Sequence, residues 1–91
     1  AALAEGEALV IPHCHAIHTW WMRFPIDVVF LKTSFRHPQS ALVITAVQQL
    51  QPFRFAWAKG ADTVIELPVG TIARTAIRIG EVLVTAEIGE R

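Results

Sequence analysis

The chain has 91 residues, 53% of them hydrophobic, and its eight basic residues balance eight acidic ones, so its formal net charge is zero. This length suffices for a single domain spanning residues 1–91 and excludes two domains with separate cores. A net charge of zero lacks the electrostatic footprint of a nucleic-acid-binding protein, so we expect no nucleic acid among the partners.

The charge-free segment over residues 8–22 is too short to cross a bilayer, which predicts no membrane span. The first residues lack a basic leader and an apolar signal core, so we expect a cytoplasmic chain or one that has already been trimmed. Cys14 is the only cysteine and cannot form an internal disulfide, which leaves the redox compartment open and mildly favours a reducing one. The high hydrophobic share, next to only 18% charged residues, is compatible with a self-association surface.

Residues 8–11 form a short apolar pattern that predicts a strand, stopped by Pro12. Residues 13–18 are predicted to form a loop or an edge segment whose imidazoles bond backbone groups or water. The alternative is a metal site, since His13 and His15 project to one side of an extended chain and His18 could join them across a bend. No second cysteine and no later His-x-His pair completes such a set, so we expect neither a metal nor another cofactor.

The segment around residues 20–31 carries the most informative polar group of the chain. Of the two adjacent indoles, Trp20 and Trp21, at least one should be buried, while the other borders a cavity. Pro25 predicts a turn or a chain crossing, and the β-branched residues 26–31 predict a strand interrupted only by Asp27.

A carboxylate at the head of a buried strand has three interpretations. Asp27 could accept hydrogen bonds from backbone N–H groups of the preceding turn, pair with Arg23 or another cation, or face a pocket. The structural role is favoured because short carboxylates at turn–strand junctions commonly accept local hydrogen bonds. A catalytic role would need a second titrating group across the cavity, such as Glu66 or a histidine.

The second half of the chain predicts further strands and one helix. Residues 32–40 are predicted to form a long polar loop, and residues 41–50 a strand antiparallel to residues 26–31. Phe53, Phe55 and Trp57 alternate along an extended segment, which predicts three aromatics on one side, covering the core. Residues 63–67 and 82–86 predict two more strands. A short helix over residues 68–76 is predicted to begin at Pro68, with one apolar face lying on the sheet.

Two long blocks and a short one, in this order, carry a resemblance to a known family. They read IHTxxMRFPIDVVFL at residues 17–31, VIELPxGTxAR at residues 64–74 and IxxG at residues 77–80. The chain closely resembles the bacterial and archaeal family called domain of unknown function 192, over about residues 6–84. The resemblance implies a mainly β fold, a small rolled, barrel-like antiparallel or mixed sheet with one short helix near residues 68–76. It implies no established reaction.

Three departures from the family pattern lead to further expectations. A β segment that usually precedes this region is absent, which leaves a sheet edge that could pair with a second copy in a homodimer. The loop over residues 32–40 is longer than the family's tight turn. The usual glycine at the helix end and a later aspartate are replaced by Ala76 and Glu81. If position 76 keeps a left-handed conformation, alanine costs about 1 kcal/mol relative to glycine.

No motif supplies a nucleophile, a base and an orienting group together, so we favour a non-catalytic ligand-binding or accessory domain. Its ligand would be a small polar molecule, such as a sugar or a peptide end, in a shallow pocket. The rival is a hydrolytic enzyme that uses Asp27 and Glu66, or His18, as acid and base. A third interpretation is a structural or partner-binding protein without a pocket. The candidate ligand-binding residues are His18, Trp20, Met22, Arg23, Asp27 and Glu66.

Overall fold

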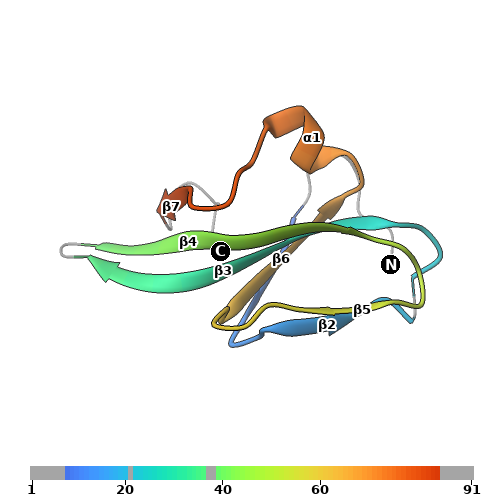
Figure 1. The fold of residues 1–91 in the computed structure, drawn as a ribbon, viewed down its shortest axis with the longest axis horizontal. Helices are drawn as coiled ribbons and strands as arrows, with labels where there is room; N and C mark the ends of the chain where they lie inside the picture. The colour runs from blue at the N-terminus through green and yellow to red at the C-terminus, as the bar shows by residue number, and fades with distance from the viewer. Residues whose placement is uncertain (1–7, 21, 37–38, 85–91) are drawn as a thin grey trace.

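A twisted antiparallel sheet with strand order β1-β6-β3-β4-β7 forms the centre of the fold (Figure 1). The computed structural model describes residues 8–20, 22–36 and 39–84. The sheet consists of β1 (Leu9–Pro12), β3 (Ile26–Arg36), β4 (Gln39–Leu50), β6 (Thr63–Pro68) and β7 (Val82–Val84). A separate two-stranded ribbon pairs β2 (Ala16–His18) with β5 (Phe55–Trp57), and the short helix α1 (Thr71–Thr75) follows β6.

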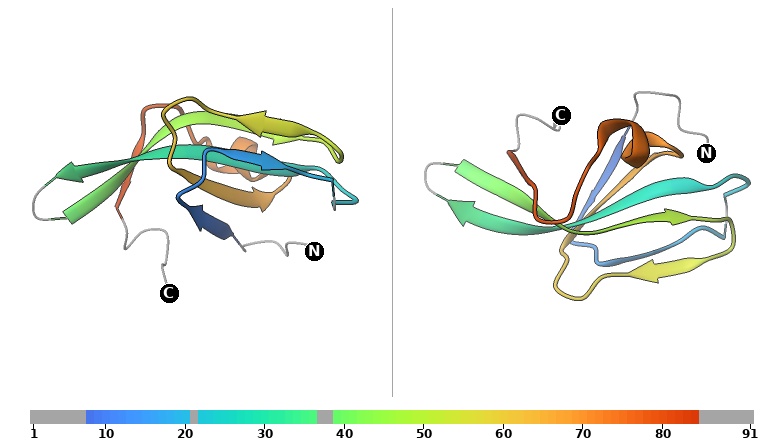
Figure 2. Two further views of the ribbon diagram at one scale, coloured as in Figure 1. Left: turned by 90° about the horizontal axis from the view of Figure 1, so that it is seen from below. Right: turned by 45° about the horizontal axis from the view of Figure 1, so that its top comes forward.

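The ribbon of β2 and β5 lies on one side of the large sheet, while α1 lies on the other (Figure 1). The chain bends sharply between β1 and β2, where His13 has a φ of 56°, and β4 curves round into β5. Backbone bonds from Cys14 N to Asp62 O and from Ala58 N to His15 O then tie the ribbon to the rest. The sheet therefore curls over itself into a half-barrel (Figure 2), which confirms the predicted rolled β fold with one short helix.

Strand β3 is buried on both of its faces, which explains its nearly continuous apolar sequence. On one face, Ile26, Val28 and Phe30 pack in a cluster with residues of the ribbon. On the other face, Val29 and Leu31 pack in a second cluster, against which partly buried side chains of α1 and the C-terminal segment lie. The two clusters thus divide the core between the inside of the half-barrel and the side that carries α1.

The predicted polar loop over residues 32–40 is wrong, because most of it belongs to a hairpin. Strand β3 runs to Arg36 and β4 begins at Gln39, with those two residues paired. The pairing of β3 with β6 ends at Leu31, so this part of the hairpin extends beyond β6. Strands with fewer neighbours tolerate polar residues, which explains why the composition resembled a loop. Residues 37–38, between the paired ends of the two strands, lie outside the described part.

The helix begins later than predicted. Pro68 is the last residue of β6, and α1 starts at Thr71, after Gly70 adopts a φ of 92°. A side chain is strained at this φ, and a Cβ at Gly70 would lie 3.2 Å from the Arg74 guanidinium. Ala76 ends the helix with a φ of 54° and a ψ of 35°, so the left-handed conformation considered above is present. The predicted strand over residues 82–86 is observed as Val82–Val84, and its last two residues lie outside the described part.

Candidate functional site

Asp27 anchors the start of α1 to the sheet. Its carboxylate is only 3% exposed, and Oδ2 accepts a hydrogen bond from the backbone N–H of Ile72 at 2.8 Å. The Gly70 preceding the helix has no side chain that could cap it, so a strand residue distant in sequence supplies the acceptor. The two blocks that carry the family resemblance therefore meet at this bond. The amide comes from α1 instead of from the preceding turn considered above.

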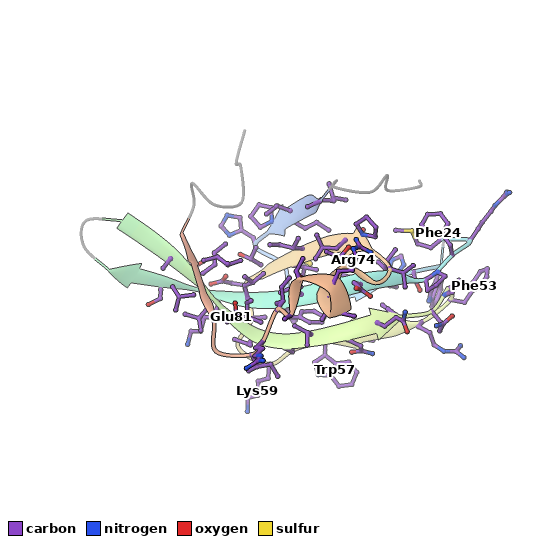
Figure 3. The ribbon with its side chains drawn as sticks, turned by 90° about the horizontal axis from the view of Figure 1, so that it is seen from above. Phe24, Phe53, Trp57, Lys59, Arg74 and Glu81 are labelled. Atoms are coloured by element: carbon purple, nitrogen blue, oxygen red, sulfur yellow. The ribbon has the colours of Figure 1, made fainter. Side chains whose placement is uncertain are left out.

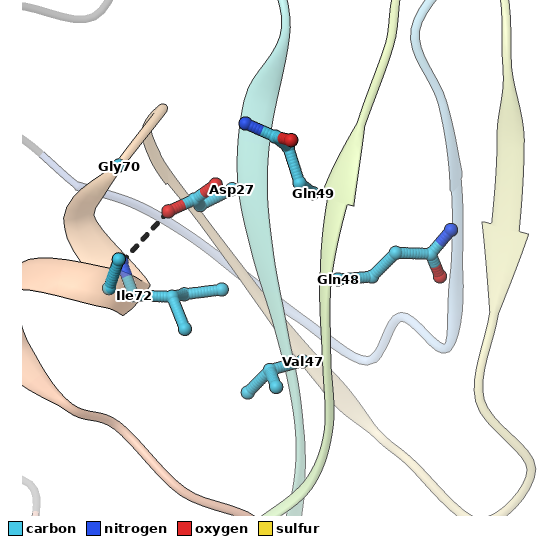
Figure 4. Close-up of a pocket in the computed structure, with 7 residues that line it drawn as sticks. Asp27, Val47, Gln48, Gln49, Gly70 and Ile72 are labelled. Atoms are coloured by element: carbon cyan, nitrogen blue, oxygen red, sulfur yellow. Dashed lines mark hydrogen bonds between the residues drawn. The ribbon is translucent and has the colours of Figure 1, made fainter.

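A shallow, open depression of about 300 Å³ lies beside this bond (Figure 4). Gln49 lies on the same side of the sheet as Asp27, whereas Gln48 points away from it. Apart from Asp27, none of the candidate residues expected from the sequence lines this depression. It is bounded by Asp27, Val47, Gln48, Gln49, Gly70, Ile72 and Ala73.

Glu66 lies inside the half-barrel, on the other face of the sheet. Cross-strand partners share a face, and Glu66 is paired with Val28, whose side chain belongs to the inner cluster. Glu66 is 7% exposed, and burial raises the pKa of its carboxyl above the ordinary value. No hydrogen bond to this carboxyl from another residue of the described part is observed.

The positions of the two carboxylates separate them chemically. Asp27 is paired with Leu67, and Glu66, the neighbour of Leu67 along β6, points to the opposite face. The sheet itself therefore stands between the two carboxyl groups. A mechanism in which they share one substrate as acid and base would require both to line one cleft.

The other four candidate residues occupy two environments. His18 and Trp20 are exposed and in contact, with ring centroids 5.4 Å apart. Met22 is partly buried against the inner cluster, and Arg23 is exposed. The six candidates therefore do not line one pocket. Trp20 is exposed, and Trp21 lies outside the described residues, so the expectation that one indole of the pair is buried is not tested.

Histidines do not converge on a metal site in the described part of the chain. Among residues 8–20, 22–36 and 39–84, no three His, Cys, Asp or Glu side chains come together in a way that could hold an ion. His13, His15 and His18 are all exposed, and a bend at His13 separates the first from the other two.

Aromatic side chains gather on the outer surface of the ribbon. The three residues predicted to cover the core, Phe53, Phe55 and Trp57, are instead 68%, 56% and 65% exposed, and that prediction is wrong. Phe55 and Trp57 share a side of β5, and Ala56 between them points inward, whereas Phe53 lies in the turn before β5 with a φ of 59°. Ala56 packs beneath the ribbon in the inner cluster with Ile17 of β2, so the rings on either side of Ala56 point outward.

We call His18, Trp20, Phe55 and Trp57 the aromatic face. His18 is the cross-strand partner of Phe55, so their side chains lie on the same side of the ribbon. Phe55 and Trp57 contact each other with ring centroids 5.6 Å apart, and Trp20, which contacts His18, is 57% exposed. Together the four rings form an exposed apolar surface of a kind that usually marks an interaction site.

Thr19 fixes the end of this face. Its side chain is fully buried, and its hydroxyl donates to Gln51 O at 2.6 Å and accepts from Arg54 N at 2.9 Å. Its backbone donates to Arg54 O and accepts from Phe53 N. The threonine of the IHT motif therefore joins β2 to the turn before β5, and this holds the rings of both strands in register.

Basic side chains, and no acidic ones, occur in the segments that build the ribbon. The segments that build the ribbon and its ends, residues 13–23 and 51–60, contain no Asp or Glu but include Arg23, Arg54 and Lys59, all exposed. Figure 3 shows Lys59 and Trp57 projecting from the same side of the molecule, with Phe53 towards one end. Sequence reasoning missed Phe55 and Trp57 as site residues. The small residues Ala56 and Ala58 between the rings were the available signal.

Asp62 is the first carboxylate in the sequence after β5, and its oxygens accept hydrogen bonds within the fold. It accepts hydrogen bonds from the backbone N–H and hydroxyl of Thr33 and from the Thr63 hydroxyl, at 2.9–3.0 Å. Burial alone would raise its pKa, but these hydrogen bonds outweigh burial and hold the pKa of Asp62 below its ordinary value.

Fold and site together define a class: a small β-rich half-barrel with an aromatic ribbon on its outside and a strand carboxylate that caps its helix. A family model described as Uncharacterized ACR, DUF192, matches residues 1–85, so the chain belongs to this uncharacterised family. The membership confirms the resemblance found in the sequence motifs. Neither curated proteins nor solved structures gave a match. Within the described residues, no helix combines the length and apolar character needed to cross a membrane.

Proposed function

We propose that this chain is a non-catalytic binding domain whose ligand stacks on the aromatic face. The observation that carries the proposal is the outward orientation of two contacting pairs of rings on a ribbon whose inward side chains, Ile17 and Ala56, already pack in the core. The exposed parts of the Phe55 and Trp57 rings contribute no burial to the folded chain, whereas a ligand with a flat ring can cover them. A sugar ring or another ring-bearing molecule has the required flat surface.

The location of this site differs from the pocket expected between His18 and Asp27. His18 and Trp20 contribute to the aromatic face, and Arg23 adds a nearby charge. Asp27 is explained by its bond to Ile72, which is a structural role. The separation of Asp27 and Glu66 by the sheet weighs against the hydrolytic alternative, because neither carboxylate has a titrating partner across an open cleft among the residues that the structure describes.

Tryptophan fluorescence tests the proposal. The wild-type chain and the variants Trp57→Ala and Phe55→Ala would be titrated with an uncharged oligosaccharide and with a short oligonucleotide, two probes that share only their rings. At least one probe should change the wild-type fluorescence, and both variants should weaken that binding. Both residues are exposed, so the variants should keep the wild-type melting temperature. The control is Ile79→Ala, which removes an exposed side chain on the segment that follows α1.

Two outcomes would contradict the proposal. One is that neither probe binds. The other is that the wild type is a stable dimer which Trp57→Ala converts to a monomer, because the rings would then be a subunit interface. Light scattering on both proteins distinguishes this case from ligand binding. The homodimer expected through a sheet edge would instead persist in Trp57→Ala.

A further inference from the structure

We infer that the ligand of the aromatic face is single-stranded nucleic acid, whose bases stack on the rings while its phosphates pair with Arg23, Arg54 and Lys59. The inference rests on the proposed function and adds the chemistry of the ligand. Stacking alone would accept any flat molecule, so the charges beside the rings must decide between ligands.

The rings meet the first requirement of such a site. Proteins that bind single strands without reading sequence present aromatic side chains on an exposed β surface, and successive bases stack on them. Here two pairs of rings are in contact, His18 with Trp20 and Phe55 with Trp57, and His18 and Phe55 are cross-strand partners in the ribbon. Phe55 and Trp57 are positions i and i+2 of β5, so their rings lie one after the other along the strand, while Trp20 lies just beyond the end of β2.

The charges meet the second requirement. The two segments that form the ribbon and its ends carry three exposed cations, Arg23, Arg54 and Lys59, and no carboxylate that would repel phosphate. Asp27 and Glu66 are buried in the sheet, and Asp62 is bonded to Thr33 and Thr63. A second copy of the chain would bring the same cations face to face, and an uncharged sugar would leave them unused. The charge complementarity therefore favours a ligand that is both ring-bearing and anionic.

This inference reverses the expectation drawn from the net charge of zero. Net charge sums the whole chain, whereas binding depends on the potential over one surface. The eight acidic residues that cancel the eight basic ones are all outside residues 13–23 and 51–60.

The test is a fluorescence titration with a short oligouridylate at increasing salt, compared with polyphosphate and with an uncharged oligosaccharide. Three phosphate contacts predict that affinity falls about 20-fold between 50 and 200 mM salt. Trp57→Ala should weaken binding roughly 5- to 150-fold while leaving the salt dependence unchanged. Lys59→Ala should lower the slope of log affinity against log salt by about 0.7, and the matched control Arg78→Ala should leave it unchanged.

The comparison probes separate the possible failures. If oligouridylate does not bind, or if polyphosphate binds as tightly as oligouridylate, the inference is overturned. If the uncharged oligosaccharide alone binds, and Trp57→Ala abolishes that binding, the inference is overturned while the proposed function stands. If Trp57→Ala weakens the binding of none of the probes, the inference and the proposed function both fail. A salt-dependent, Trp57-dependent preference for oligouridylate over both other probes supports the inference.

Discussion

At the scale of single residues, Asp27 is the side chain whose interpretation changes most between sequence and structure. A buried carboxylate beside a depression invites a catalytic interpretation, yet Oδ2 accepts a hydrogen bond from the amide that begins α1. Asp27→Ala should therefore lower the free energy of unfolding by about 1–2 kcal/mol, the usual cost of losing a helix cap. Urea denaturation monitored by circular dichroism measures this loss.

The conservative variant distinguishes capping from other roles of Asp27. Asp27→Asn keeps an oxygen that can accept the Ile72 N–H, so it should lose less stability than Asp27→Ala. Binding to the aromatic face should be unchanged in both variants, since Asp27 lies on the opposite side of the sheet from the ribbon. Equal stability of Asp27→Ala and the wild type would refute the capping role.

Glu66 should destabilise the fold at neutral pH. Burial raises the pKa of its carboxyl in the folded state above the ordinary value of 4.5, so ionisation is disfavoured there. Glu66→Gln should accordingly raise the melting temperature at neutral pH. The gain should shrink as the pH falls through the folded pKa and vanish below the unfolded one, where the acid is protonated in both states. Thermal unfolding of both proteins across this pH range measures it, and a lower melting temperature of Glu66→Gln at pH 7 would show a favourable carboxylate contact instead.

At the scale of elements, the end of α1 contains an identifiable strain. Ala76 has a φ of 54°, where a Cβ is disfavoured and where the family pattern has glycine. Ala76→Gly should raise the free energy of unfolding by about 1 kcal/mol. The matched control is Ala73→Gly inside the same helix, which should lower it by about 0.5–1 kcal/mol. Chemical denaturation compares the two, and a loss of stability in both variants would show that position 76 needs no left-handed residue.

The link between β2 and the turn before β5 depends on one hydroxyl. Thr19→Val keeps the volume of the side chain but leaves Arg54 N and Gln51 O without their partner, which should cost about 2 kcal/mol. Thr19→Ser keeps the hydroxyl and should cost less. Hydrogen exchange of the Arg54 amide should accelerate in the valine variant only. Unchanged exchange there would mean that the hydroxyl does not hold the ribbon.

Sequence patterns predicted elements well where one rule decided the outcome, and poorly where two rules competed. The apolar run from Ile26 identified β3, and its pairing with β4 followed from alternation. The hairpin end was missed because β3 has no β6 partner beyond Leu31, and a strand with fewer neighbours can have the composition of a loop. Pro68 was assigned to the helix because proline suits both a first helical turn and the end of a strand. The left-handed turn at Gly70 decides between these, and it requires three-dimensional information.

At the scale of the whole molecule, the sequence showed which residues alternate but not which side faces the core. Phe55 and Trp57 were assigned to the interior because aromatics are usually buried, and only the closure of the half-barrel shows that Ala56 fills that place. The two carboxylates expected in one candidate site lie apart for a related reason. Asp27 and Glu66 belong to neighbouring strands, and the register places them on opposite faces. Neither the register nor the direction of closure can be read from composition.

The central claim is that ligand is bound by the outside of the ribbon, while the buried Asp27 carboxylate serves the fold by accepting the Ile72 N–H. Nuclear magnetic resonance shift mapping with ¹⁵N-labelled protein and a short oligouridylate tests it most directly, because every region reports at once. We predict shifts of the Trp20 and Trp57 indole N–H signals and of the backbone amides in β2 and β5, with the amides of Gly70 and Ile72 unchanged. Shifts centred on Gly70, Ile72 and Gln49, with the ribbon unperturbed, would contradict the account and return the site to the depression beside Asp27.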